Sequence, residues 1–123
     1  MDQVFGKAKN DIQGLKAISA IEISTGLPIG SLVLDPSFDI DAASAYNAEV
    51  VKAKIKAKNA MGFEGELVEI IIIELSSQIH IIQPTPNEQY IIYLAADKAS
   101  TNIGMTRKVV KQLAGELEVL LGE

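Results

Sequence analysis

The fold class follows from residues 66–75, which read Glu-Leu-Val-Glu-Ile-Ile-Ile-Ile-Glu-Leu. We expect Glu66 to Leu75 to form a strand. A strand with one face in water alternates between apolar and polar residues, whereas this one is apolar on both faces. The sequence therefore predicts a sheet that is covered by helices on both of its faces.

Periodicity, turn residues and capping residues predict the elements on either side of this strand. They are a helix over Asp2 to Ile12, a hairpin of Leu15 to Ser24 and Pro28 to Leu34, a helix over Ile40 to Met61, strands over Gln78 to Gln83 and Gln89 to Ala96, and a helix from the caps Ser100, Thr101 and Asn102 to Leu121. Gly14, Gly62 and Gly122 are expected to end the three helices. The order α-β-β-α-β-β-β-α predicts an α+β fold, a five-stranded antiparallel sheet in one domain over residues 1–123.

Composition narrows the class of protein. The chain has 123 residues, of which 48% are apolar and only 5% aromatic, so the core is expected to be aliphatic. There is no cysteine, which favours a reducing cytoplasm. The polar segment Met1 to Asn10 is unlike a signal peptide, and no apolar run approaches the roughly 18 residues of a membrane span. The 16 acidic residues outnumber the 11 basic ones, so a nucleic-acid partner is not expected.

Residues that carry catalysis or bind metals do not form a recognisable set. His80 is the only histidine and alternates with isoleucines on a predicted strand, without the partners of a catalytic or zinc site. Asp35, Asp39 and Asp41 lack the spacing of a calcium loop, because the sixth residue from Asp35 is Ile40 rather than glycine. We expect these carboxylates at a helix start. No catalytic residue, metal site or cofactor is predicted.

Three further motifs favour structural roles. Gly62-Phe63-Glu64-Gly65 has the outline of a loop that clamps a nucleic-acid backbone, but Glu64 would repel phosphate, so a helix end and a turn explain it better. No glycine-rich phosphate loop occurs, so the chain itself is not expected to bind a nucleotide. Arg107, the only arginine, lies at the border of the last helix's apolar stripe and is expected to cover the core edge.

A cluster of lysines stands out in this acidic chain. Its members are Lys52, Lys54, Lys56 and Lys58. Helical spacing places Lys54 and Lys58 on one flank of the long helix and the other two on another. A solvated face near a helix C-terminus explains the cluster, and the alternative is a surface that steers an acidic partner.

Two short segments resemble a known family. The hairpin segment Ser24-Thr25-Gly26-Leu27-Pro28-Ile29 and the helix opening Asn102-Ile103-Gly104-Met105-Thr106-Arg107 are similar to segments of the roadblock family, the dynein light chain type of module. The isoleucine-rich strand after a long second helix resembles that family as well. The resemblance covers nearly the whole chain and implies a profilin-like fold.

The resemblance also implies a function without an active site. It implies a homodimer or heterodimer that acts as a regulator or scaffold of a Ras-like GTPase or as an adaptor. Together with the composition, which favours a cytoplasmic protein with no nucleic-acid partner and no membrane insertion, it predicts a homodimer that binds and modulates a small Ras-like GTPase. By analogy with the family sheet order, the isoleucine-rich strand lies at an edge and pairs with its copy through Glu69, Ile70, Ile71, Ile72, Ile73 and Glu74. Lys54 and Lys58 are the predicted contacts of the GTPase. The alternatives are an adaptor subunit of a larger complex and, less favoured, a small-ligand sensor.

Overall fold

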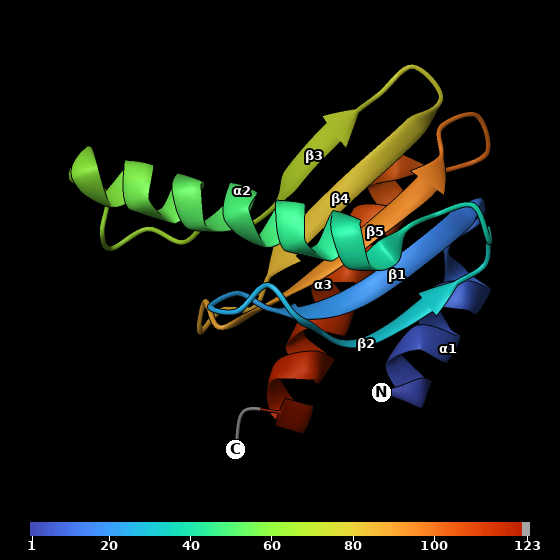
Figure 1. Ribbon diagram of the computed structural model, residues 1–123, viewed down its shortest axis with the longest axis horizontal. Coiled ribbons are helices and arrows are strands. Elements are labelled where there is room, and N and C mark those ends of the chain that lie inside the picture. Colours follow the sequence, from blue (N-terminus) through green and yellow to red (C-terminus); the bar gives the residue numbers. More distant parts are fainter. Residues whose placement is uncertain (122–123) are drawn as a thin grey trace.

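The computed structural model describes residues 1–121, which form three helices and five strands (Figure 1). The elements are α1 (Asp2–Asp11), β1 (Leu15–Glu22), β2 (Pro28–Val33), α2 (Ile40–Ala60), β3 (Ile71–Glu74), β4 (Gln78–Pro84), β5 (Tyr90–Asp97) and α3 (Ile103–Leu121). Their order confirms the predicted α-β-β-α-β-β-β-α arrangement. Gly122, the predicted end of the last helix, lies outside the described residues.

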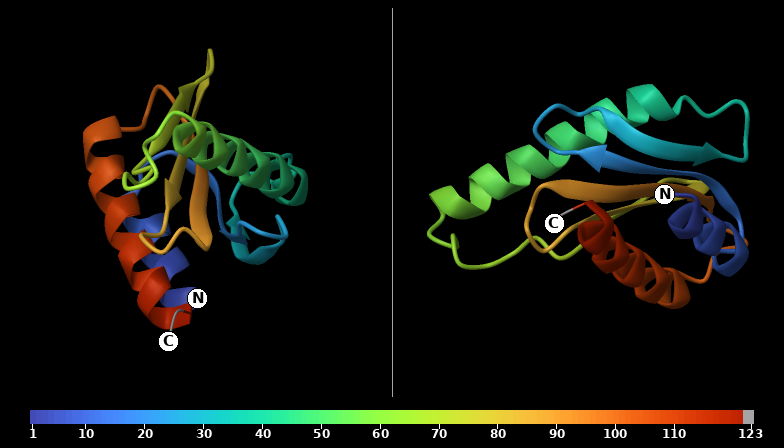
Figure 2. Two further views of the ribbon diagram at one scale, coloured as in Figure 1. Left: turned by 90° about the vertical axis from the view of Figure 1, so that its left-hand side faces the viewer. Right: turned by 90° about the horizontal axis from the view of Figure 1, so that it is seen from below.

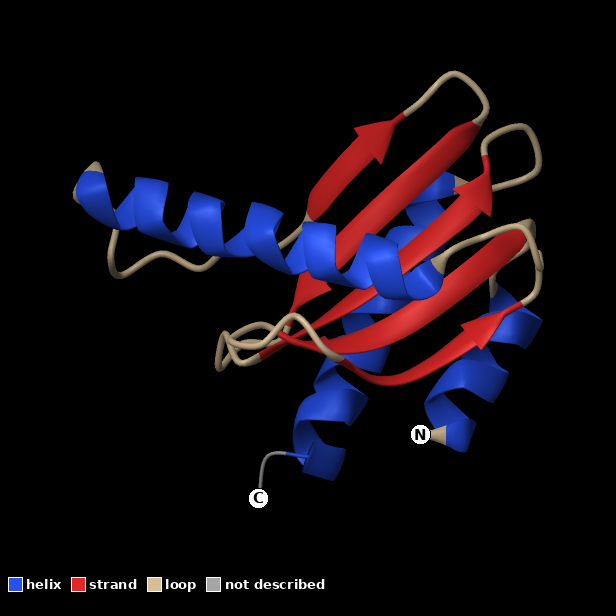
Figure 3. Cartoon of the chain, viewed as in Figure 1, coloured by secondary structure: helices blue, strands red, loops and turns tan. Residues whose placement is uncertain are grey.

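The five strands form one antiparallel sheet in the order β2-β1-β5-β4-β3. The helix α2 crosses one face of this sheet, and α1 and α3 lie side by side on the other face (Figure 2). The predicted helices on both faces are therefore confirmed. The C-terminal half of α2 extends beyond the sheet (Figure 3), and among residues 52–60 of this helix only Lys58 is buried.

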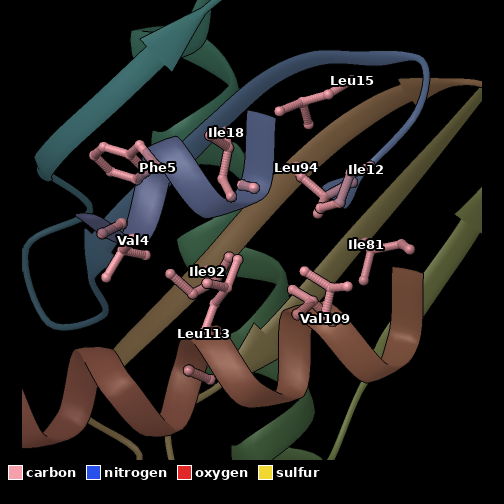
Figure 4. Packing of buried hydrophobic residues seen from close by; sticks show 14 of the residues in the cluster. Val4, Phe5, Ile12, Leu15, Ile18, Ile81, Ile92, Leu94, Val109 and Leu113 are labelled. Atoms are coloured by element: carbon pink, nitrogen blue, oxygen red, sulfur yellow. The ribbon is translucent and has the colours of Figure 1, made fainter. Parts of the chain in front are cut away.

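Two mainly aliphatic clusters form the core, one on each face of the sheet. The larger cluster lies against α1 and α3, and the strand residues Ile18, Ile81, Ile92 and Leu94 contribute to it (Figure 4). The smaller cluster lies beneath α2. Because successive strand residues point to opposite faces, each central strand supplies both clusters, which explains why these strands are apolar throughout.

Helix ends and turns use the residues that the sequence indicated, with one exception. The Asp39 carboxylate accepts a hydrogen bond from the Ala42 amide at 3.1 Å, and the Asn102 side chain accepts one from the Met105 amide at 3.0 Å. Asp35 does not cap a helix. Its carboxylate accepts hydrogen bonds from the hydroxyl and amide of Ser37, which close a turn and lower the pKa of Asp35.

The strand β3 is shorter than predicted. It spans Ile71–Glu74, while residues 66–70 pair with no strand in the part of the chain that the structure describes. If the β3–β4 register continued, residues 67 and 69 would face Pro86 and Pro84. A proline has no N–H to donate to a ladder, so the chain opposite residues 67 and 69 offers them no backbone donor, which weakens pairing beyond Ile71.

Candidate interaction surface

The strand β3 is an edge strand, as the resemblance implied. It pairs with β4 in the register Ile71↔Ile82 to Glu74↔Ile79, and no other described strand lies on its outer side. The edge is open in the single chain. It therefore presents backbone N–H and C=O groups to solvent or to another strand.

The register fixes which backbone groups point outward. The Leu75 amide donates to the Gln78 carbonyl at 2.8 Å, so this pair belongs to the hydrogen-bonded set of the antiparallel ladder. Hydrogen-bonded pairs alternate along the strand, which places the N–H groups of Ile71 and Ile73 toward β4. The N–H groups of Ile72 and Glu74 consequently point to the open edge.

The predicted interface residues lie together along this edge. Ile70 and Ile72 pack against the cluster beneath α1 and α3, whereas Ile71 and Ile73 pack against the cluster beneath α2. All four isoleucines remain partly exposed. The flanking residues Glu69 and Glu74 are exposed, and Glu74 forms an ion pair with Lys98 at 3.3 Å. An apolar edge with charged ends is the result.

The helix α2 carries a second apolar stripe that faces solvent. Tyr46 is 75% exposed, Val50 is 40% exposed and Met61, directly after the helix, is 58% exposed. Ala53 and Ala57 are exposed between them. The spacing i, i+4, i+7, i+11 places the helical members on one side of α2, and we call these five residues the apolar flank. Sequence reasoning missed it, although the repeat of apolar residues at these positions was visible.

The two predicted lysine contacts have different environments. Lys54 is exposed, but Lys58 is only 7% exposed. The Lys58 ammonium donates to the Asn59 side chain at 2.9 Å and lies 3.9 Å from the Glu88 carboxylate. The expectation that both lysines share one accessible flank is therefore corrected. The ion pair with Glu88 in the β4–β5 turn keeps the Lys58 side chain buried. Of the two predicted contacts, Lys54 alone is accessible to solvent.

His80 is partly buried and forms polar contacts with Gln78 on its own strand and with Tyr93 on β5. Its Nε2 donates to the Gln78 side-chain oxygen at 2.9 Å, and its Nδ1 accepts from the Tyr93 hydroxyl at 3.3 Å. The ring of His80 is also in edge-to-face contact with the rings of Phe38 and Tyr93. Burial lowers the pKa of His80 and raises the pKa of Tyr93 to about 12. These contacts fix His80 in a structural position.

Residues 1–121 contain neither a cluster of metal-ligating side chains nor a membrane-spanning helix. Within residues 1–121 no three His, Asp or Glu side chains are grouped as a metal site would require. None of the helices in this range combines the length and the apolar character needed to cross a membrane. Arg107 is exposed on α3, where it lines a groove beside Pro84 rather than covering the core edge.

Solved structures with the same fold match nearly the whole chain. A roadblock/LC7 domain from Streptomyces avermitilis matches with a TM-score of 0.83 at 14% identity, over 100% of this chain and 98% of that one. MglB of Myxococcus xanthus matches with a TM-score of 0.77 at 16% identity, over 97% and 82%. An MglB described with a tetrameric arrangement matches with a TM-score of 0.80 at 13% identity, over 96% and 85%.

Sequence comparison alone gives no match. No family model and no curated protein sequence matches the chain. At identities of 13–16%, the structural likeness concerns the fold. The fold predicted from the hairpin and helix motifs is confirmed.

Proposed function

We propose that this chain, which has the roadblock/LC7 fold, is a non-catalytic regulatory module that works as a homodimer and binds and modulates a small Ras-like GTPase. The observation that carries the proposal is the open β3 edge, together with the exposed apolar flank of the neighbouring helix α2. The cytoplasmic location is part of the proposal and rests on the lack of cysteine.

The β3 edge supports the homodimer because an apolar edge strand in water is a template for aggregation. Pairing with the same strand of a second copy would cover it and continue the sheet across a two-fold axis. The outward N–H groups of Ile72 and Glu74 would then donate to the partner. The arrangement reported for an MglB of the same fold is consistent with self-association.

The exposed side chains of the apolar flank of α2 also support the homodimer. Tyr46, Val50 and Met61 expose apolar surface. In a monomer, the solvent-facing positions of such a helix would ordinarily carry polar residues. Burying it against the partner would add to the area of the strand junction, toward an interface of roughly 1,600 Å².

Proline substitution on β3 tests the homodimer. In Ile72→Pro, the lost N–H is the one that faces the open edge, so the fold should survive and the protein should sediment as a monomer. In Ile71→Pro, the lost N–H bonds to β4, so the domain should unfold or nearly so. The measurements are analytical ultracentrifugation at micromolar concentration and circular dichroism.

The outcome of the proline pair is decisive for the junction. A wild-type protein that is monomeric at micromolar concentration removes the homodimer. A folded Ile72→Pro variant that stays dimeric shows that the junction lies elsewhere.

The GTPase part of the proposal rests on the motifs that resemble roadblock proteins and on Lys54. Lys54 is exposed and forms no ion pair with a described residue. Affinity capture from the native host, with GDP and with a GTP analogue, should enrich a Ras-like GTPase in one of the two states. Lys54→Glu should then slow association several-fold at low salt, since charge at an interface rim acts mainly on the on-rate.

Lys9→Glu is the matched control for Lys54→Glu. Lys9 is also an exposed helical lysine without a described ion-pair partner, and it lies on α1, across the sheet from α2. Equal on-rates for the two variants would remove Lys54 from the contact. Capture of a multisubunit assembly without a GTPase would favour the adaptor alternative.

A further inference from the structure

A groove of about 520 Å³ lies between α3 and the segment that precedes β3. Its apolar lining comes from Leu67, Val68, Ile70, Pro84, Pro86 and Ala114. The groove is on the α3 side of the sheet, whereas α2 lies on the other side. It is therefore separate from the apolar flank and from Lys54.

Positive charge gathers on the α3 wall of this groove. Arg107, Lys108 and Lys111 line it, all three are exposed, and none forms an ion pair with a described residue. Five other lysines of the chain do pair with carboxylates. Arg107 and Lys111 are i, i+4 neighbours, an arrangement of like charges that disfavours the helix. The net charge of the chain is −5, so three cations without an ion-pair partner beside one apolar groove form a local positive surface that complements an acidic ligand.

We infer that this groove is a docking surface for an acidic, partly apolar peptide segment of a partner protein. Apolar side chains would occupy the lining formed by Leu67 and Pro86, and carboxylates would meet the cations of α3. In an extended peptide, residues i and i+2 are about 6.6 Å apart, close to the roughly 6 Å that separates side chains one helical turn apart. In a peptide that alternates acidic and apolar residues, successive acidic side chains therefore have about the spacing of Arg107 and Lys111, while the apolar side chains point to the opposite side.

Glu69 on the opposite wall gives the groove a polarity. It is an exposed carboxylate that also lines the groove. It would repel carboxylates on its own side, so the acidic residues of the peptide must lie along α3. The groove therefore has one wall that attracts acidic side chains and one that excludes them.

A labelled eight-residue peptide of alternating glutamate and leucine tests the inference by fluorescence anisotropy. The wild-type protein should bind it saturably, and binding should weaken as salt is raised. Lys111→Glu and Arg107→Glu should each weaken it about tenfold or more, while Lys9→Glu, with the same change of net charge, should leave it within about twofold. A peptide with glutamine in place of each glutamate should bind about tenfold more weakly than the acidic one.

Several results would overturn the inference. They are a lack of saturable binding, equal binding of the glutamine peptide, and an equal loss in Lys9→Glu, which would reveal an effect of net charge alone. Binding of phosphatidylglycerol vesicles through Arg107 and Lys111, without binding of the peptide, would assign the groove to a membrane surface instead. Circular dichroism of each variant shows that a loss of binding is not a loss of fold.

Discussion

At the scale of single residues, the partial burial of His80 makes stability depend on pH. Burial lowers the pKa of His80, so the folded chain keeps the ring neutral while the unfolded chain protonates it below about pH 6.5. The unfolded state then binds more protons. The free energy of unfolding must therefore fall as the pH decreases from about 6.5 toward the lowered pKa of the folded state.

The first prediction is that His80→Gln removes this dependence. Urea unfolding between pH 7.5 and pH 5 should give a falling free energy of unfolding for the wild-type protein and a flatter curve for the variant. The glutamine cannot take up a proton, so the folded and unfolded variant chains bind equal numbers at this position. Parallel curves would show that the buried environment of His80 does not shift its protonation.

The second prediction concerns the pair of Lys58 and Glu88. One Glu88 carboxylate oxygen is buried without a hydrogen bond and has the Lys58 ammonium 3.9 Å away. Lys58→Met should lower the free energy of unfolding by about 1–3 kcal/mol, because it leaves that carboxylate buried without its cation. Adding Glu88→Gln should recover part of the loss.

A double-mutant cycle measures this coupling. The four proteins are the wild type, both single variants and the double variant, each unfolded in urea at pH 7. Additive losses would mean that the two side chains do not interact.

At the scale of elements, the sequence predicted the order and the bounds of most helices and strands. It did not predict features that depend on a neighbouring element. The helices and the four strands other than β3 lie within one to two residues of their expected bounds, because glycines, caps and apolar spacing act locally. The length of β3 depends instead on Pro84, at the end of the facing strand β4, and on Pro86 just beyond it. A pattern within residues 66–75 cannot contain that information.

The residues of the candidate surface show the same contrast between what the sequence predicted and what it did not. The edge residues Ile70 to Ile73 were predicted because the family order places their strand at an edge. The burial of Lys58 was not, since its partner Glu88 is far along the chain and holds a left-handed backbone with φ 59°. Helical spacing alone assigned Lys58 to the flank of Lys54 and could not reveal this partner.

The third prediction places a charge in the apolar flank of α2. Val50→Asp should weaken self-association at least about tenfold, because the carboxylate would be buried without a partner in the dimer. Lys56→Asp, at an exposed α2 position outside the flank, is the control and should leave the sedimentation coefficient unchanged. If both variants remain dimeric, α2 makes no contact in the dimer.

At the scale of the whole molecule, the sheet separates two surfaces. The helix α2 lies on one face and the groove beside α3 on the other, while the β3 edge lies between them, and Glu69 and Ile70 belong both to the predicted strand junction and to the lining of the groove. A peptide in the groove and a GTPase on α2 would therefore not compete for the same residues.

The C-terminal half of α2, which extends beyond the sheet, has a consequence for hydrogen exchange (Figure 1). Residues 52–60 are held to the rest of the chain mainly by the buried Lys58 and the partly buried Ile55, so in an isolated chain this half should open by local fraying long before the sheet does. Its backbone amides should exchange with deuterium quickly at nanomolar protein and more slowly at micromolar protein, where a second copy holds the helix. The amides of β5 should be slow at both concentrations. The exchange rates of the amides in this half of α2 would thus report, residue by residue, the fraction of chains that are monomeric.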